Sequence, residues 1–180
     1  MRYSTRKLET PEQLYACAMR SLMRRARSIH EMKQTLERRA ADPEMIPALI
    51  ARLKASNYLD DARYARDFAR VHAAERRQGR FRIERELRRR GVPDRHIEAA
   101  LTSAFVENDE ASMVRKRIER KLKLLRGPLD PRRIASLYGS LLRAGFPADL
   151  IRRELKAATR EQVALPVDEF LPDEAAAIEE

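Results

Sequence analysis

Two adjacent carboxylates, Asp60 and Asp61, stand in the segment SNYLDDARYARDF of a chain of 180 residues. Paired carboxylates can hold a metal ion or act as an acid/base pair, but either use needs further Asp, Glu or His side chains around them. The three histidines, His30, His72 and His96, have no ligand-type spacing to one another. The sequence therefore predicts no catalytic site and no metal site at this pair.

The pair has an architectural interpretation instead. Asp60 and Asp61 stand just before a segment with helical spacing of its apolar residues. At such a position the unsatisfied backbone N–H groups and the helix dipole favour acids by about 0.3–1 kcal/mol per interaction. Tyr58 and Leu59, which precede the pair, are predicted to form an apolar hinge that packs one helical unit on the next.

The composition indicates a folded helical protein. The chain is 43% hydrophobic and 37% charged, with five glycines and no tryptophan, and it contains no clear alternating Val/Ile/Thr run. The single cysteine, Cys17, cannot form an internal disulfide. No stretch reaches the roughly 18 apolar residues of a membrane span, and the opening segment MRYSTRKLET has no apolar core of a signal peptide. We expect a cytoplasmic protein without a membrane segment.

Charge is unevenly distributed along the chain. The formal net charge is +10, yet residues 161–180 hold seven acids and no lysine or arginine. Residues 1–160 therefore carry 38 bases and 21 acids, a net charge of +17. A body of this charge attracts polyanions over a Debye length of about 8 Å in physiological salt, which makes nucleic acid and acidic protein surfaces the candidate partners. We expect residues 161–180 to form a flexible acidic tail.

One unit occurs three times in the sequence. Apolar residues keep the same spacing in three segments that begin at Met32, Ile83 and Leu137, and the second and third segments share a Gly–apolar–Pro turn. Each unit contains three stretches with apolar spacings of three and four, which is typical of helices. The sequence predicts an all-α fold of three tandem three-helix, helix-turn-helix-like repeats. Their predicted bounds are 11–56, 57–105 and 106–160.

Helix-capping signals set the boundaries independently of the repeat. Ser28 opens a Ser-x-x-Glu capping box, and Asp42 and Asp130 each precede a proline, as N-cap residues often do. Gly91 and Gly145 stand where helices must end. The predicted helices are 11–26, 28–40, 43–55, 61–77, 80–90, 93–105, 108–126, 131–144 and 147–159.

The second predicted repeat, residues 57–105, resembles a known family. The residues that carry the resemblance are Tyr58, Leu59, Asp60, Asp61, Tyr64, Ala65, Phe68, Gly79, Arg82, Ile83, Glu86, Leu87, Arg88, Gly91, Val92, Ile97, Ala100 and Leu101. In type and spacing they resemble the RecX family, the regulators of the RecA recombinase. The resemblance covers about residues 14–156. It departs from the family pattern at Tyr64, where the family often has phenylalanine, and at Phe81, where a small residue or proline often stands.

This resemblance implies both a shape and a role. It implies a curved, elongated array of repeats that lies in the groove of a RecA filament on single-stranded DNA. The protein would modulate RecA, mainly by inhibiting ATP hydrolysis, strand exchange and co-protease activity, through hindered filament extension or promoted disassembly. It would act as a monomer in recombination, DNA repair and the SOS response, with double-stranded DNA as a possible non-specific partner.

Arginine-rich stretches are the candidate binding surface. The segment RRQGRFRIERELRRR holds eight arginines and two glutamates. Glu84 and Glu86 are spaced to pair with the arginines four residues further on, which leaves Arg82, Arg85 and Arg89 as the least neutralised stripe. Arginine's forked donors suit phosphate or carboxylate. Two more basic stripes lie in the first and third units, and the bases of the stripe in the third unit surround an apolar seam.

The predicted nucleic-acid or filament-binding residues are all basic. They are Arg20, Arg24, Arg27, Arg76, Arg77, Arg80, Arg82, Arg85, Arg88, Arg89, Arg117, Arg120 and Lys121. The aromatic residues Phe68, Phe105, Tyr138 and Phe146 are interpreted as packing residues rather than base-stacking platforms.

A helix-turn-helix transcription regulator is the alternative function. Its recognition helix would need base-edge readers, but the third-helix segments PDRHIEAALTSAF and PADLIRRELKAAT are poor in Asn and Gln. An enzyme is not expected, because the sequence has no phosphate-binding Gly-x-x-x-x-Gly-Lys or Gly-x-Gly-x-x-Gly pattern and no nucleophile with an obvious base. No cofactor is expected either.

Overall fold

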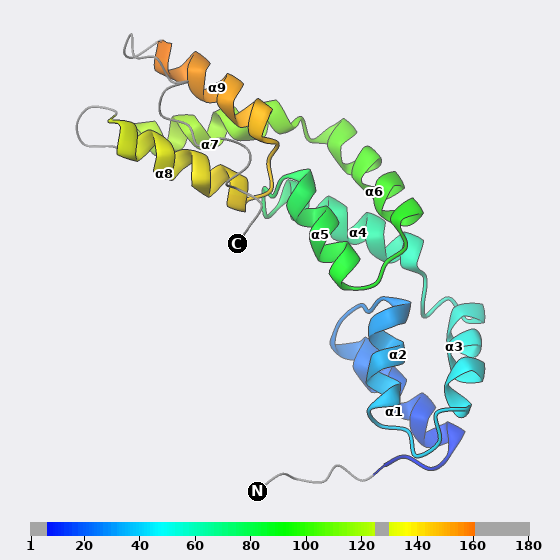
Figure 1. Cartoon of the computed structure of the whole chain (residues 1–180). Coiled ribbons are helices and arrows are strands. Elements are labelled where there is room, and N and C mark those ends of the chain that lie inside the picture. Colours follow the sequence, from blue (N-terminus) through cyan, green and yellow to red (C-terminus); the bar gives the residue numbers. More distant parts are fainter. Residues whose placement is uncertain (1–6, 125–129, 161–180) are drawn as a thin grey trace, which may run out of the picture. The chain divides into compact units, whose positions relative to one another are not determined.

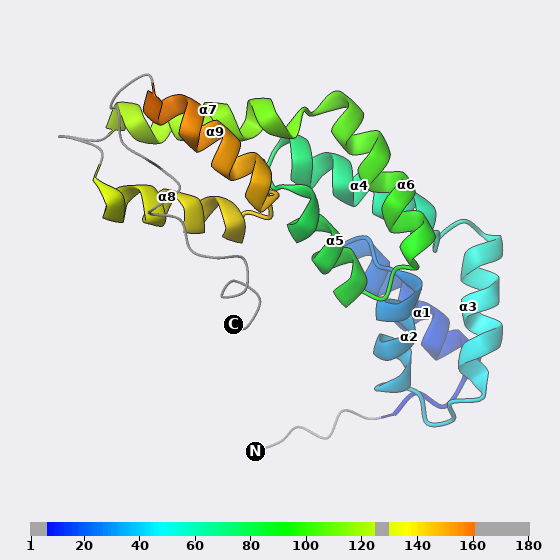
Figure 2. The ribbon, with the colours of Figure 1, turned by 45° about the horizontal axis from the view of Figure 1, so that its top comes forward.

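The computed structural model describes residues 7–124 and 130–160 of the chain (Figures 1 and 2). Within these ranges it contains nine α-helices, in three successive groups of three, which confirms the all-α prediction. The helices are α1 (Pro11–Arg24), α2 (Ile29–Glu37), α3 (Met45–Ala55), α4 (Asp61–Ala74), α5 (Arg80–Arg89), α6 (Asp94–Glu107), α7 (Glu110–Leu124), α8 (Pro131–Arg143) and α9 (Ala148–Arg160).

Side-chain caps fix several helix starts. Thr10, Ser28 and Asp130 each accept the backbone N–H three residues further on, at 3.3, 3.1 and 2.8 Å. The Glu31 carboxylate returns to the N–H of Ser28, which completes the predicted capping box. Such caps satisfy donors that the helix itself cannot, and each stabilises by about 1 kcal/mol.

Several predicted boundaries are wrong by two or three residues, among them the end of α2, the start of α3 and the end of α4. Asp42 does not cap α3, because its carboxylate accepts the N–H of Glu44 (2.9 Å) in a turn and the helix begins only at Met45. α4 ends at Ala74 rather than three residues later, because Arg77 adopts a left-handed backbone with φ 51°. At Asp42 a side-chain turn delays the start of the helix, and at Arg77 a left-handed residue ends the helix before the apolar periodicity does.

The chain divides into two compact units, which do not coincide with the three predicted repeats. The first comprises the described residues up to Phe68 together with Glu86–Ala100. Its core gathers side chains from α1, α2 and α3 and from the segment after α3; Leu59 joins this core, whereas Tyr58 is 46% exposed. The buried core residues are Leu14, Ala18, Met32, Leu36, Ala40, Ile46, Leu49, Leu53 and Leu59.

A short backbone contact pins the start of the first unit. The N–H of Leu8 donates to the carbonyl of Arg39, and the N–H of Ala41 donates to the carbonyl of Leu8, each at 2.8 Å. Leu8 and Ala40 thereby form a parallel β-bridge beside the end of α2. No sequence pattern predicts this bridge, since its partners Leu8 and Ala40 are 32 residues apart.

The second unit comprises Ala69–Arg85 together with the described residues from Leu101 onwards. Here α7, α8 and α9 pack on one another (Figure 1). Val114 and Ile118 from the predicted apolar seam of α7 lie at the centre of this packing. The buried core residues are Val114, Ile118, Leu137, Tyr138, Leu141, Ala144, Phe146, Leu150, Ile151 and Leu155.

The bounds predicted for the three repeats stay a prediction, because the chain passes from one compact unit to the other within α4, α5 and α6 rather than between repeats. The predicted acidic tail, residues 161–180, lies outside the described residues. Over the described ranges, the search for a helix of sufficient length and apolarity to cross a membrane finds none. The same ranges hold no group of three or more His, Cys, Asp or Glu side chains that could bind a metal ion.

Candidate nucleic-acid interface

Asp60 and Asp61 have different partners in the first unit. The Asp60 carboxylate caps α4 by accepting the N–H groups of Ala62 (2.9 Å) and Arg63 (3.0 Å). The Asp61 carboxylate accepts the N–H of Ile29 (2.9 Å), the first residue of α2. Asp61 is only 7% exposed, and burial raises the pKa of its carboxyl against the opposing effect of the Ile29 hydrogen bond. Both carboxylates are therefore occupied by backbone donors, one capping a helix and the other tying two helices together.

Asp109 and Glu110 repeat this arrangement in the second unit. Asp109 caps α7 through the N–H of Ser112 (2.8 Å), and Glu110 accepts the N–H of Arg80 (2.9 Å), the first residue of α5. Ile29 and Arg80 occupy equivalent positions of the repeat. The Arg80 guanidinium adds an ion pair to Glu110 at 3.1 Å, so this arginine, which was predicted to bind a ligand, is already engaged within the fold.

A glycine turn completes the contact in the first unit. Gly91 has φ 70°, and a Cβ atom at this position would collide with the ring of His30. The hydroxyl of Ser28 donates to the carbonyl of Arg90 at 2.5 Å. We call this arrangement of the start of α2, Asp61 and the Gly91 turn the first joint.

The second unit contains the same turn at Gly145, whose φ is 91°. A Cβ atom on Gly145 would collide with the backbone and Cβ of Arg82. The N–H of Gly79 donates to the carbonyl of Ala144 (2.9 Å), and the N–H of Phe81 donates to the carbonyl of Gly145 (3.1 Å). The start of α5, Glu110 and the Gly145 turn form the second joint, which fixes the backbone from which the α5 arginines project.

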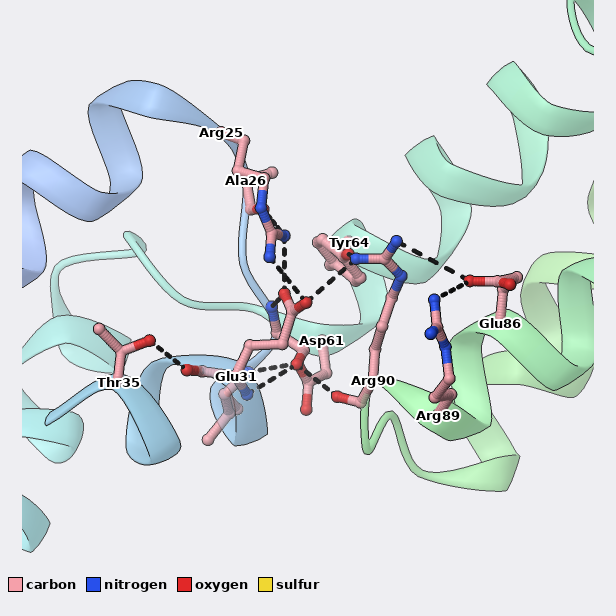
Figure 3. A network of polar contacts seen from close by, with 11 residues as sticks. Arg25, Ala26, Glu31, Thr35, Asp61, Tyr64, Glu86, Arg89 and Arg90 are labelled. Atoms are coloured by element: carbon pink, nitrogen blue, oxygen red, sulfur yellow. Dashed lines mark hydrogen bonds and ion pairs between the residues drawn. The ribbon is translucent and has the colours of Figure 1, made fainter. Parts of the chain in front are cut away.

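Glu31 is the centre of a charged network in the first joint (Figure 3). Its carboxylate accepts two hydrogen bonds from Arg25, both at 2.9 Å, and one from Arg90 at 3.0 Å. Arg90 also donates to the hydroxyl of Tyr64 at 3.2 Å. Burial alone would raise the pKa of Glu31, but the hydrogen bonds and charge of Arg25, with help from Ser28 and Arg90, outweigh it and hold the pKa below its ordinary value.

Three arginines predicted to bind a ligand come together in the second unit. Burial lowers the pKa of the Arg117 guanidinium on α7, and the positive charges of Arg120 and of Arg82 on α5 lower it further. The α5 and α7 basic stripes therefore meet here, which their sequence separation did not reveal. We call Arg82, Arg117 and Arg120 the basic cluster. Arg82 also donates to the carbonyl of Arg143 at 3.1 Å, which holds its guanidinium in place.

Arg85 lies beside the basic cluster on α5. Ile83 and Leu87 are fully buried, and at about 100° per residue Arg85 projects from the opposite face of the helix. Arg85 is exposed and has no carboxylate partner in the part of the chain that the structure describes. Lys121, one residue beyond Arg120, is also exposed. These two cations extend the basic cluster into solvent.

The predicted stripe of Arg82, Arg85 and Arg89 needs a correction. Arg89 pairs with Glu86 at 2.8 Å, a spacing of three that the prediction did not weigh for this residue. Arg88 pairs with Asp94 at 2.9 Å across the turn that follows α5. The Arg88–Asp94 pair is well exposed, and Arg89 is exposed while Glu86 is half-buried, so each pair stabilises the fold by less than about 1 kcal/mol.

The remaining predicted cations lie apart from the basic cluster in sequence. Arg20 and Arg24 are exposed in the first unit. Arg27 is half-buried there, and burial, followed by the charge of Arg25, lowers the pKa of its guanidinium. In the second unit Arg76 and Arg77 are exposed in the segment that follows α4.

The sequence interpretation missed Arg25, Glu31, Arg90 and Glu110 as joint residues, although the recurring acid pair before α4 and α7 was a visible signal.

The structure thus defines a helical repeat protein that carries clustered guanidinium groups on its surface. Two family descriptions match the chain: "RecX, first three-helix domain" over residues 15–53 and "RecX, second three-helix domain" over residues 60–101.

Curated relatives extend the match beyond these two domains. The chain is 33% identical over 147 residues to the regulatory protein RecX of Trichlorobacter lovleyi, covering 79% of this chain and 94% of the relative. It is 35% identical over 167 residues to that of Deinococcus radiodurans, covering 93% of this chain and 74% of the relative. The chain belongs to the RecX family of regulatory proteins.

Solved structures agree on the fold. The crystal structure of RecX from Lactobacillus salivarius superposes with a TM-score of 0.67 at 20% sequence identity, covering 82% of this chain and 95% of that one. A second crystal structure of a regulatory protein RecX gives a TM-score of 0.71 at 20% identity, covering 82% of this chain and 73% of the other.

Proposed function

We propose that this protein binds the RecA filament on single-stranded DNA and modulates it, mainly by inhibition. ATP hydrolysis, strand exchange and co-protease activity are the affected functions, through hindered filament extension or promoted disassembly. Membership of a family of regulatory proteins supports the regulatory role. The charge of the body of the chain, +17 over residues 1–160, supports a polyanionic partner in the cytoplasm.

The basic cluster is the observation that carries the proposal. Burial lowers the pKa of the Arg117 guanidinium, and the positive charges of Arg120 and Arg82 lower it further. A phosphate or carboxylate placed among them would relieve the repulsion between these charges and accept forked hydrogen bonds. Arg85 and Lys121 then add exposed charge without a requirement for a particular base sequence.

Several weak contacts are expected to act together. Each compact unit exposes predicted binding arginines, Arg20 and Arg24 in the first and Arg85 and Arg120 in the second. A filament presents the same phosphate and protein surfaces repeatedly, so one engaged unit raises the effective concentration of the other. A monomer is sufficient for this mode of binding.

A RecA ATPase assay on single-stranded DNA tests the proposed function. The purified protein should slow RecA-catalysed ATP hydrolysis at substoichiometric or near-stoichiometric ratios. An unchanged rate at a molar excess of the protein would remove the proposal.

A salt titration of DNA binding separates the proposal from a transcription regulator. Phosphate contact predicts a steep loss of affinity with salt and no preferred sequence. Retained discrimination among duplex sites at high salt would favour the helix-turn-helix alternative.

A further inference from the structure

Phe81 is exposed at the first turn of α5. Its side chain is 54% exposed, and no other phenylalanine in the described ranges is among the exposed large apolar residues. The aromatic residues that the sequence assigned to packing behave differently: Tyr138 and Phe146 are buried, and Phe68 and Phe105 are half-buried. Scattered apolar residues on a surface are common, so exposure alone assigns no role to Phe81.

The second joint does not use the Phe81 ring. At the equivalent position of the first joint, the side chain of His30 lies against the Gly91 turn. In the second joint the backbone and Cβ of Arg82 make this close approach to Gly145 instead. The Phe81 ring therefore does not pack against the glycine turn in the way that the His30 ring does in the first joint.

The backbone beneath the ring is nevertheless held firmly. The N–H of Phe81 donates to the carbonyl of Gly145 (3.1 Å), and that of Gly79 donates to the carbonyl of Ala144 (2.9 Å). The next N–H along the chain from Gly79, that of Arg80, is accepted by Glu110 at 2.9 Å. Three consecutive backbone anchors at residues 79–81 thus present an exposed aromatic ring from a fixed position, which lowers the entropy lost when a ligand binds.

Cations flank the ring on one side. At about 100° per residue, Arg85 lies roughly 40° around the helix from Phe81, and Arg82 of the basic cluster lies roughly 100° around it. The exposed face of α5 therefore runs from an apolar ring to unneutralised guanidinium groups. Sites for single-stranded nucleic acid combine these two features, because bases stack on aromatic rings while phosphates contact the cations.

We propose that Phe81 is a stacking platform for an unpaired nucleobase whose backbone phosphates lie on Arg85 and the basic cluster. This inference rests on the proposed function and adds to it the preference for single strands over duplex. A duplex offers its phosphates to the arginines but keeps its bases stacked inside. Phe81 therefore supplies discrimination between the two forms of DNA, while the arginines supply affinity for both.

Tryptophan fluorescence tests the platform directly, because the natural chain has no tryptophan. The variant Phe81→Trp carries a single indole at the proposed platform, and Val106→Trp carries one at a position that is 81% exposed and next to an acid, Glu107. Oligo(dT) should quench the Phe81→Trp emission strongly and that of Val106→Trp little. An oligomer of the same length with abasic sugars should bind through its phosphates and quench neither.

Phe81→Ala gives a second readout. Loss of one stacked base should weaken oligo(dT) binding by about 5- to 100-fold. The dependence of affinity on salt should stay the same because no phosphate contact is lost, and affinity for duplex DNA should also be unchanged. Arg85→Ala should instead weaken binding to both single-stranded and duplex DNA and make the salt dependence of both affinities shallower. Equal quenching of both tryptophans would overturn the platform. So would a loss of duplex affinity in Phe81→Ala equal to its loss of oligo(dT) affinity. In either case, salt-dependent DNA binding would leave the proposed function standing. Absence of any DNA binding by the natural chain overturns the platform as well, and the RecA ATPase assay then decides the proposed function separately.

Discussion

Asp61 accepts the backbone N–H of Ile29 at 2.9 Å, 32 residues back along the chain, and thereby joins the start of α4 to the start of α2. Glu110 does the same for Arg80 at 2.9 Å in the second unit. One acid of each adjacent pair caps its own helix and the other anchors the middle helix of the preceding repeat. Successive repeats are thus joined by backbone hydrogen bonds to carboxylates, which hold the basic surface of α5 in a defined orientation.

Substitutions of Asp61 should separate its role as an acceptor from its charge. Asp61→Ala leaves the Ile29 N–H without its acceptor, and we expect a loss of about 1–3 kcal/mol in the free energy of unfolding. Asp61→Asn keeps an oxygen acceptor and removes a charge that burial disfavours, so its stability at neutral pH should stay close to that of the natural chain. Urea unfolding measures both, and equal destabilisation by the two substitutions would contradict this role.

Asp61 also determines how its own contribution to the stability of the fold changes with pH. Because burial raises its folded-state pKa above the ordinary value of 3.8, its contribution to stability is present below 3.8 and is lost as the pH rises through the folded pKa. The Asp61→Asn variant should lose this part of the stability profile. Unfolding curves recorded across the acid range provide the measurement.

Glu31 has the opposite pH dependence. Its pKa is held below the ordinary value of 4.5, so its stabilisation is present above 4.5 and is lost as the pH falls through the folded pKa. Glu31→Gln should cost about 1.5–3 kcal/mol at neutral pH, since two charged donors lose a charged acceptor. The matched control is Glu37→Gln, whose pair with Lys33 is exposed at 3.9 Å and should contribute less than about 0.5 kcal/mol. Similar losses in both variants would show that the network in Figure 3 is no stronger than a surface pair.

Two glycine substitutions should change stability in opposite directions. Gly91→Ala forces a side chain into left-handed backbone and against the His30 ring, and we expect it to cost more than about 1 kcal/mol. Gly139→Ala lies inside α8, where the nearest neighbour is the flexible end of Arg143 at 3.2 Å, and should stabilise by about 0.5–1 kcal/mol. Thermal unfolding compares the two, and a neutral Gly91→Ala would remove the requirement for glycine in the first joint.

Arg80 and Arg85 should differ in what their loss affects. Arg80→Ala removes the ion pair with Glu110 (3.1 Å) and the contact of the guanidinium with the Phe105 ring (5.6 Å), so it should lower stability. Arg85→Ala should leave stability unchanged and make the salt dependence of single-stranded DNA binding shallower by about one unit of slope. Unfolding and binding measured on the same two proteins decide the assignment. Loss of DNA affinity confined to Arg80→Ala would reverse it.

Most of the fold follows from local signals in the sequence. Apolar spacing and caps such as Ser28 and Asp130 identify all nine described helices, because these features act within one or two turns. Asp42 misled the prediction because its side chain formed a two-residue turn in place of a cap. Gly91 and Gly145 were located correctly, since only a glycine tolerates their backbone without strain.

The joints and the basic cluster could not be predicted in the same way. The ion pair of Glu31 with Arg90 spans 59 residues, and the proximity of Arg82 to Arg117 depends on how α5 and α7 pack. The sequence analysis assigned Arg80 and Arg85 the same binding role, although one is tied to Glu110 and the other is exposed. What separates them is tertiary contact, which repeat periodicity does not encode.

The central claim is that exposed cations around the basic cluster act on the RecA filament. The variant with Arg85→Ala, Arg120→Ala and Lys121→Ala removes three exposed charges there, and a control with Arg66→Ala, Arg70→Ala and Arg132→Ala removes three exposed charges elsewhere. The most direct measurement is RecA-catalysed ATP hydrolysis on single-stranded DNA in the presence of each protein. We expect the natural chain and the control to inhibit alike and the first variant to have lost most of its inhibition while remaining fully helical. Equal inhibition by the two triple variants would contradict the claim.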